Sequence, residues 1–247
     1  PPLGYPQEGL NWGGRFEYRH DETNNVGLVN PGASKRDTWL MNNLLTVKVD
    51  KDWRMIARLN GSYSTSNQGD FYHGNYLEAV LGFAYRPVAN DKLNMLFKYT
   101  YFYDLPSPGQ RVGVGGVGDY SQQSHVLSVD AIYDLNQHFS IGGKYAIRTG
   151  MLKDNVNNGP WHSSTTQLAI ARLDFHVVKQ WDIMAEVRRL SVSAAGDSQT
   201  GALVGVYRHV NDNFRMGVGY DFTNFSDDLT QLSTRYRGFF VNAIGMF

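Results

Sequence analysis

Charged side chains occur at every second position in many stretches of the 247-residue chain, and apolar side chains fill the positions between them. Trp53 and Met55, for example, alternate with Arg54 and with the polar positions that follow. A period of two places the two kinds of side chain on opposite faces of a β-strand. Twelve charged residues share this phase and are expected to line one interior: Arg54, Arg58, Glu78, Lys98, Asp130, Lys144, Arg148, Arg172, Asp174, Glu186, Arg188 and Arg215.

An interior of this kind supports two kinds of chemistry. Eight of the twelve residues are basic and four are acidic, so a water-filled passage between them would favour anions. Alternatively, the charges satisfy one another and brace the wall, because charges in a confined interior need partners. Neighbouring strands are expected to bring Asp130 to the depth of Lys98 and Lys144, and Arg172 to the depth of Glu186. Both roles can hold at once.

Other residues on the expected inner face set the size of the passage. Asp182 and Arg208 fall on this face, and small residues such as Ala146, Gly217 and Gly219 are expected to leave free space there. Barrels of about eight strands are filled by side chains, and barrels of about sixteen strands hold an aqueous channel. The barrel expected here has about twelve strands and falls between these two sizes. Because no stretch predicts a plug helix, we expect a narrow, water-filled passage.

Candidate residues for catalysis or metal binding are few. His125 lies near Ser124 and Ser128 in the sequence, but within a strand it would point to the face opposite both serines. The other histidines have no metal-ligand spacing, and Asp227 with Asp228 indicates a solvated turn rather than a calcium site. We therefore expect no catalytic residue, no metal and no cofactor.

The glycines of residues 113–118, Gly-Val-Gly-Gly-Val-Gly, have the spacing of a dinucleotide-binding fingerprint. That motif requires a strand before it and a helix that begins at its last glycine. Residues 119–122 instead begin another alternating segment. The glycines are therefore expected to form a surface loop.

The alternation predicts an all-β chain of about twelve antiparallel strands. Short polar turns are expected to alternate strictly with longer polar or glycine-rich connections, one of which covers residues 22–36. A soluble barrel would alternate in the same way but would turn its apolar face inward. The predicted strands are residues 10–21, 38–50, 53–63, 73–87, 92–104, 123–135, 139–150, 165–177, 181–193, 200–210, 214–223 and 238–247.

Composition narrows the class of protein further. The 23 basic and 23 acidic side chains balance, which argues against a nucleic-acid partner. The chain has no cysteine, which fits passage through an oxidising periplasm. Residues 1–8 are proline-rich and predict an extended linker, and residues 9–247 predict a single barrel. Since no secretory signal precedes Pro1, we expect a mature chain or a C-terminal domain.

The last ten residues, 238–247, alternate apolar positions and end on Phe247. They resemble the closing strand of Gram-negative outer-membrane β-barrels. The resemblance implies an up-and-down transmembrane barrel with short periplasmic turns, located in the bacterial outer membrane beside lipid and lipopolysaccharide. It also implies recognition by the barrel-assembly machinery through Phe239, Val241 and Phe247. Closure of the first strand on the last is expected, because an open edge in lipid leaves backbone groups unpaired.

Three functions follow from this architecture. The first is a narrow pore for passive passage of ions or small solutes, with a weak preference for anions. The second is a membrane anchor or translocator of a larger surface protein, since residues 207–222 and 225–229 also resemble the tail of barrels that end such proteins. The third and less favoured function is an outer-membrane hydrolase with its site at the rim of the barrel.

Overall fold

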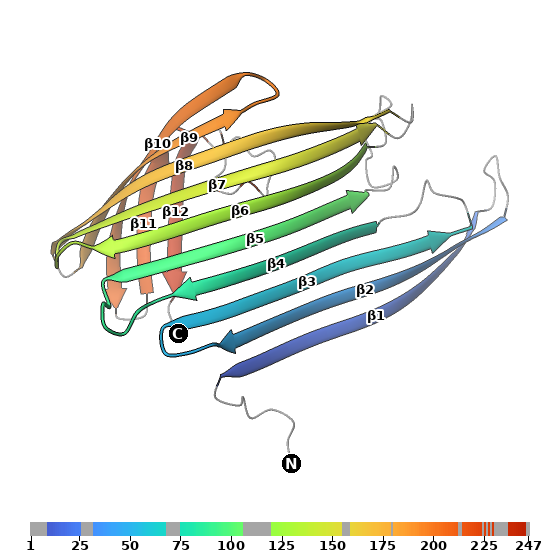
Figure 1. Cartoon of the computed structure of the whole chain (residues 1–247), viewed down its shortest axis with the longest axis horizontal. Coiled ribbons are helices and arrows are strands. Elements are labelled where there is room, and N and C mark those ends of the chain that lie inside the picture. Colours follow the sequence, from blue (N-terminus) through green and yellow to red (C-terminus); the bar gives the residue numbers. More distant parts are fainter. Residues whose placement is uncertain are drawn as a thin grey trace, which may run out of the picture.

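The computed structural model of the chain contains twelve β-strands (Figure 1). The structure describes residues 9–25, 32–67, 75–105, 120–154, 159–178, 180–211, 214–223 and 237–245, together with residues 225, 227 and 229. The expected linker of residues 1–8, the glycine motif of residues 113–118 and Phe247 lie outside the described residues. The strands are β1 Leu10–Asn25, β2 Gly32–Lys48, β3 Trp53–Ser66, β4 Asn75–Tyr85, β5 Leu93–Leu105, β6 Tyr120–Asp134, β7 Phe139–Asp154, β8 Trp161–Val178, β9 Trp181–Val192, β10 Asp197–Asn211, β11 Phe214–Asp221 and β12 Gly238–Gly245.

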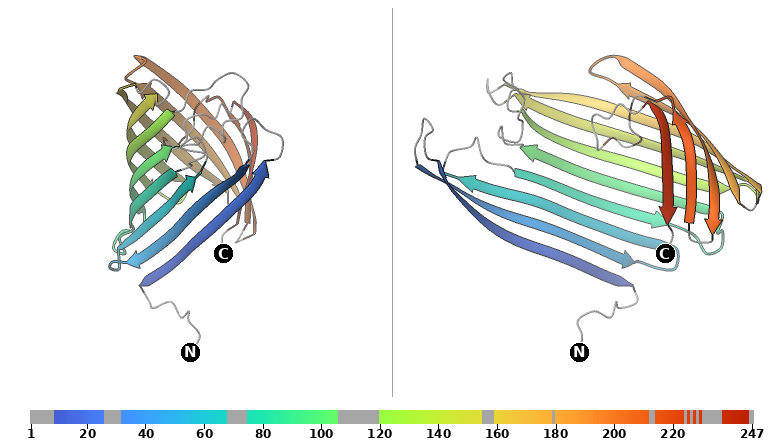
Figure 2. Two further views of the ribbon diagram at one scale, coloured as in Figure 1. Left: turned by 90° about the vertical axis from the view of Figure 1, so that its right-hand side faces the viewer. Right: turned by 180° about the vertical axis from the view of Figure 1, so that it is seen from behind.

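The strands form one antiparallel sheet in which each strand pairs with its neighbour in sequence, from β1 to β12. The predicted twelve-stranded up-and-down order is therefore confirmed. The sheet curls, so that β10–β12 lie across an interior from β3–β6 (Figure 2). Among the described residues, no backbone pairing joins β1 to β12, so the expected closure is not seen there. That part of the chain also contains no helix long and apolar enough to cross a membrane.

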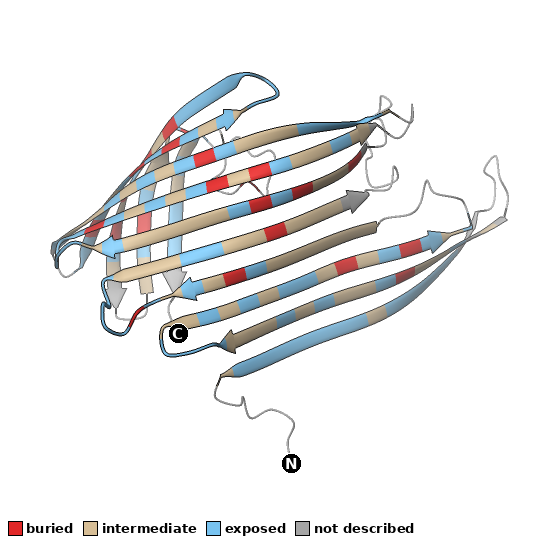
Figure 3. Ribbon diagram, viewed as in Figure 1, coloured by how far each residue is buried: buried red, intermediate tan, exposed pale blue. Residues whose placement is uncertain are grey.

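The outer face of the sheet is apolar and the inner face is polar. Phe16 is 70% exposed and Phe239 is 89% exposed on the outer face, whereas Arg148 and Glu186 are buried on the inner face. Figure 3 shows the buried positions gathered along the middle strands. A soluble barrel would have the reverse arrangement. The apolar exterior is suited to lipid, where alternating barrel strands turn their apolar positions outward.

Two connections differ from those predicted. The first two strands continue beyond the predicted ends, where polar side chains pair across them: Lys35 lies 3.4 Å from Glu22, and His20 lies 2.7 Å from Asp37. The connection between β9 and β10 is a four-residue turn, residues 193–196, in which Gly196 has φ +60°. At four residues this connection is as short as the turn of residues 49–52, although it is longer than the two-residue connections on either side of it.

Asn136 holds the short turn between β6 and β7. Its Oδ1 accepts hydrogen bonds from the backbone N–H groups of His138 (2.8 Å) and Phe139 (3.0 Å). Asn and Asp side chains commonly close turns in this way. The turn sets Phe139 at the start of β7, where its ring stacks on Phe175 of β8 with centroids 4.6 Å apart.

Asn136→Ala is expected to lower the free energy of unfolding by about 1 kcal/mol, because two backbone donors lose their acceptor. Urea titration of the folded barrel in detergent measures this change. Gln137→Ala, at the next exposed position of the same turn, is the control and should change the stability by a few tenths of a kcal/mol. Equal effects of the two substitutions would show that the side-chain acceptor at Asn136 does not hold the turn.

Candidate functional site

The inner face of β6–β12 encloses a cavity of about 820 Å³. Charged side chains make up much of its wall, and they come from β6, β8, β9 and β11 and from the connection between β11 and β12. Six carboxylates and four guanidinium groups line the cavity: Asp134, Asp174, Asp182, Glu186, Asp221, Asp227, Arg172, Arg188, Arg215 and Arg237. The cavity is thus slightly acidic, although the twelve predicted residues are mostly basic.

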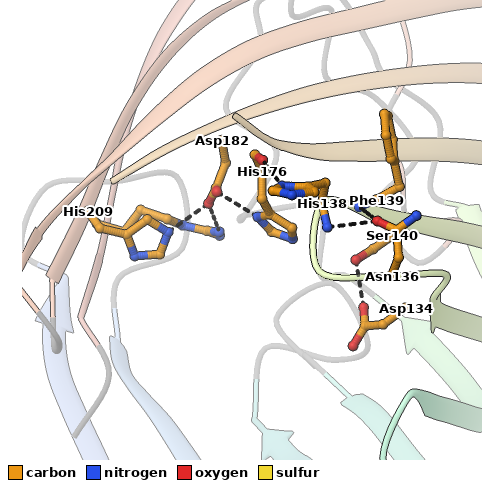
Figure 4. A network of polar contacts seen from close by, with 9 residues as sticks. Asp134, Asn136, His138, Phe139, Ser140, His176, Asp182 and His209 are labelled. Carbon is orange, nitrogen blue, oxygen red and sulfur yellow. Dashed lines mark hydrogen bonds and ion pairs between the residues drawn. The ribbon is translucent and has the colours of Figure 1, made fainter. Parts of the chain in front are cut away.

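Asp182 joins four strands at the end of the cavity where the short turns lie (Figure 4). Its Oδ1 lies 2.7 Å from His176 Nδ1 of β8, and its Oδ2 lies 2.7 Å from His209 Nε2 of β10. Arg215 of β11 lies 3.5 Å from the same Oδ2. The carboxylate is buried, and it ties β9 to the strands on both sides. We call these four residues the Asp182 cluster.

Five of the twelve predicted residues line the main cavity: Arg172, Asp174, Glu186, Arg188 and Arg215. Arg54 and Asp130 line a second cavity of about 760 Å³, to which Arg172 also contributes. A smaller pocket of about 60 Å³ is lined by Lys144, Asp130 and Glu186, among others. Arg58 forms an ion pair with Glu78 at 2.8 Å, and Lys98 lies opposite Ser128 on the neighbouring strand.

The charges pair differently from the sequence-based expectation. Asp130 does lie opposite Lys144, and Arg172 opposite Glu186, in the strand register. Two ion pairs of β8 and β9, however, run along one strand: Arg172 pairs with Asp174 at 3.1 Å, and Arg188 pairs with Glu186. Residues two apart on a strand share a face, so a long guanidinium side chain reaches the carboxylate beside it. These pairs brace the wall.

Residues of the β11–β12 connection fold into the lumen. Leu229 is 7% exposed and packs with Val126, Ala146 and Leu168, with Phe225 beside this cluster. Arg148 donates a hydrogen bond from Nη1 to the backbone carbonyl of Leu229 at 3.0 Å. Lys144 Nζ donates to the backbone carbonyl of Asp227 at 2.7 Å, so Asp227, which is exposed, lies at the lumen wall. We call residues Phe225, Asp227 and Leu229 the lumen segment.

Glycines on β10 and β11 receive aromatic and threonine side chains. A β-carbon at Gly217 would lie 2.2 Å from the ring of Tyr207, and one at Gly219 would lie 2.4 Å from the ring of Phe240. The expectation that these two glycines leave free space is therefore wrong, because rings occupy it. Thr223 likewise lies over Gly201, with its Oγ1 donating to the carbonyl of Ala202 at 3.3 Å.

The residues whose position on the inner or outer face was not predicted, or was predicted wrongly, lie mainly near the Asp182 cluster. His176 is in phase with Arg172 along β8, a signal that could have identified it as an inner residue. Arg208 was expected inside but is exposed, and its guanidinium lies 5.5 Å from the centre of the Trp181 ring. Since residues of one strand alternate, His209 takes the inner position beside it.

His125 belongs to the outer face. Its Nδ1 lies 2.8 Å from the hydroxyl oxygen of Tyr99, and its ring lies 5.0 Å from that of Tyr101. Ser124, the adjacent residue, is buried on the other face. A serine and a histidine in this arrangement cannot share a proton.

Comparisons with known proteins bear on the fold. No family model and no curated protein matches the sequence. Among solved structures, the siderophore receptor PirA from Pseudomonas aeruginosa superimposes with a TM-score of 0.57 and 10% identity, over 88% of this chain and 39% of the receptor. The NanC porin gives a TM-score of 0.47 and 9% identity, over 97% of this chain and 100% of the porin. A FadL homologue from Pseudomonas aeruginosa gives a TM-score of 0.49 and 14% identity, over 97% and 73% of the two chains.

The chain thus spans well under half the length of the siderophore receptor, 39% of it. At 10% identity the likeness concerns the course of the backbone. It agrees with the twelve antiparallel strands, the apolar outer face and the charged interior. Together these features give the chain the fold of a bacterial outer-membrane β-barrel.

Proposed function

We propose that the chain is an integral outer-membrane protein that forms a narrow pore for the passive passage of ions and small solutes. The observation that carries the proposal is the charged cavity of about 820 Å³ inside a sheet whose outer face is apolar. Charged side chains that line an interior keep it hydrated, and water-filled barrels pass small polar solutes. The lipid bilayer, with its lipopolysaccharide, is the surrounding medium in this proposal.

The pore is proposed to prefer anions weakly. Bases outnumber acids by eight to four in the predicted set of wall residues, and this excess favours anions. Two features limit the preference. The main cavity has six carboxylates and four arginines, and Arg58, Arg172 and Arg188 are paired with acids. An ion therefore meets nearly balanced charge along the wall.

Planar-bilayer recordings of the refolded chain under a salt gradient test this function. Steady openings with a small reversal potential of the sign expected for anions would support it. A folded, inserted barrel that passes no current under any condition would contradict it. Heat-modifiable mobility in gels and β-rich circular dichroism establish that the barrel is folded before each recording.

Arg172→Glu is expected to lower the anion-to-cation permeability ratio about fivefold. A charge close to a passing ion changes its electrostatic energy in water by about 1 kcal/mol, and this energy corresponds to a factor of about five. Arg172 lines both larger cavities described above, so its charge lies where ions would pass. Reversal potentials under a salt gradient measure the ratio.

Arg208→Glu is the matched control. It makes the same change of charge as Arg172→Glu, but on the outer face, where Arg208 lies beside Trp181. It should leave the reversal potential unchanged. A shift of equal size in both variants would show that Arg172 does not line the ion path.

A second function, membrane anchor or translocator of a larger surface protein, is favoured by the filled lumen. Leu229, Tyr207 and Phe240 occupy space that a wide pore would leave open. Leu10, at the start of β1, pairs beside the short turn of residues 49–52. A polypeptide that preceded residue 9 would therefore start at the short-turn end, and it would need to cross the lumen to reach the long-loop side. The barrel-assembly machinery, acting on Phe239, Val241 and Phe247, is a proposed partner in either function.

Surface labelling separates these two functions. A reporter domain fused before Pro1 would become accessible to protease on intact cells if the barrel translocates it. The pore function predicts current without such exposure. The rim-hydrolase alternative gains nothing from His125, whose ring contacts tyrosines on the outer face.

A further inference from the structure

The wall of the lumen carries an apolar row among its charged residues. Ala146, Leu168 and Leu190 lie directly opposite one another on β7, β8 and β9. Val126 extends the row onto β6. Apolar side chains that face water in a passage are unfavourable unless another apolar surface covers them. We call Val126, Ala146, Leu168 and Leu190 the apolar row.

The lumen segment supplies that cover. Leu229 packs on Val126, Ala146 and Leu168, and Leu168 is 0% exposed as a result. Phe225 packs against the same cluster, as do Ile170 and Leu190. The occupant of the apolar row is thus a segment of the same chain.

Two cations hold the lumen segment in place. Lys144 and Arg148 stand two positions before and two positions after Ala146 on the inner face of β7. They donate to the backbone carbonyls of Asp227 and Leu229, which are two positions apart on the segment. The donors are four positions apart on the wall, and Ala146, which shares an apolar cluster with Leu229, lies between them.

The start of the connection is fixed as well. Thr223 is buried over Gly201, and its backbone N–H donates to Asp221 Oδ1 at 2.7 Å. A side chain at residue 201 would collide with Thr223, since a β-carbon there would lie 2.6 Å away. Gly201 therefore permits the chain to turn inward after β11.

We propose that the lumen segment is a plug that closes the pore at the apolar row, and that ions pass only when Leu229 leaves this row. The proposal rests on the pore function above. Apolar constrictions stop ions because water withdraws from them. All the contacts that hold the plug are non-covalent, since the chain has no cysteine, so withdrawal needs no chemical step.

A reversible tether tests the plug. Ala146→Cys combined with Leu229→Cys introduces two thiols into a chain that has none, at positions that share one apolar cluster. The oxidised barrel should pass no current, and a reductant added to the same bilayer should restore the current of the untethered protein. Failure of the disulfide to form in the folded barrel would overturn the placement of Leu229.

Loosening the plug should have the opposite effect. Leu229→Ala is expected to raise the open probability about tenfold, because the apolar constriction loses its largest contact. Leu127→Ala is the matched control, since Leu127 adjoins Val126 in sequence but is exposed on the outer face. It should leave the open probability unchanged.

The outcomes separate the plug from the pore. Equal current through the oxidised and the reduced tether would overturn the plug and leave the pore function standing. Silence of every folded variant, including Leu229→Ala combined with Phe225→Ala, would overturn the pore function and the plug together. Current that stops on oxidation and returns on reduction would support both.

Discussion

Valine in place of Gly217 is expected to lower the free energy of unfolding by about 3 kcal/mol, at the upper end of overpacking effects. A β-carbon there would lie 2.2 Å from Cδ1 of Tyr207, whose ring is 6% exposed inside the lumen. The ring cannot withdraw without cost, since Arg215 lies over its face, 4.9 Å from its centre. Urea titration in lipid vesicles, followed by tryptophan fluorescence and by mobility in gels, measures the loss.

Gly13→Val is the matched control for this substitution. Gly13 also lies in a strand, but a β-carbon there would meet nothing within 4 Å. The control should change stability by at most a few tenths of a kcal/mol. Tyr207→Ala combined with Gly217→Val should recover part of the loss, because the collision is removed. Equal stability of Gly217→Val and Gly13→Val would show that the ring of Tyr207 moves aside freely.

The number of strands and the direction of their faces could be predicted because a membrane barrel has two environments at a period of two. Residues such as Trp53 and Arg54 report those environments directly, one to lipid and one to the lumen. The predicted ends of the strands were less accurate. Lys35 and Glu22 extend the first hairpin through an ion pair that depends on register, and register is not visible in one strand alone.

The partners of the charged residues could not be predicted from phase alone. Cross-strand neighbours and residues two apart on one strand both lie within reach of an arginine side chain. Arg172 takes Asp174 along its own strand although Glu186 lies opposite it. Choosing between such partners requires the rotamer of a long side chain, and the sequence does not specify it.

The plug left almost no signal in the sequence. Lys144 and Arg148 bind backbone carbonyls, which every residue carries, so no particular residue type marks the segment that they hold. Taken by themselves, Phe225 and Leu229 look like the apolar residues of any connection between strands. The glycines gave a misleading signal, because a small residue can mark either an empty space or a place where a ring packs closely.

Removing the carboxylate of Asp182 is expected to destabilise the barrel by about 2 to 3 kcal/mol. Breaking a buried ion pair at one partner costs roughly 3 to 5 kcal/mol, and the partial exposure of His176, His209 and Arg215 places this case below that range. Asp182→Ala leaves Arg215 without this carboxylate and removes the side-chain link among four strands at the short-turn end. Urea titration of the folded barrel measures the loss.

Asp182→Asn separates charge from hydrogen bonding, because the amide keeps one acceptor oxygen. It should lose less stability than Asp182→Ala, and Asp91→Ala in an exposed turn should lose almost none. Asp182 also lines the main cavity, so both cluster variants should move the permeability ratio toward anions, opposite to Arg172→Glu. An unchanged unfolding free energy in Asp182→Ala would mean that the four strands hold together through their backbone pairing alone, whatever the cluster contributes to the electrostatics of the pore.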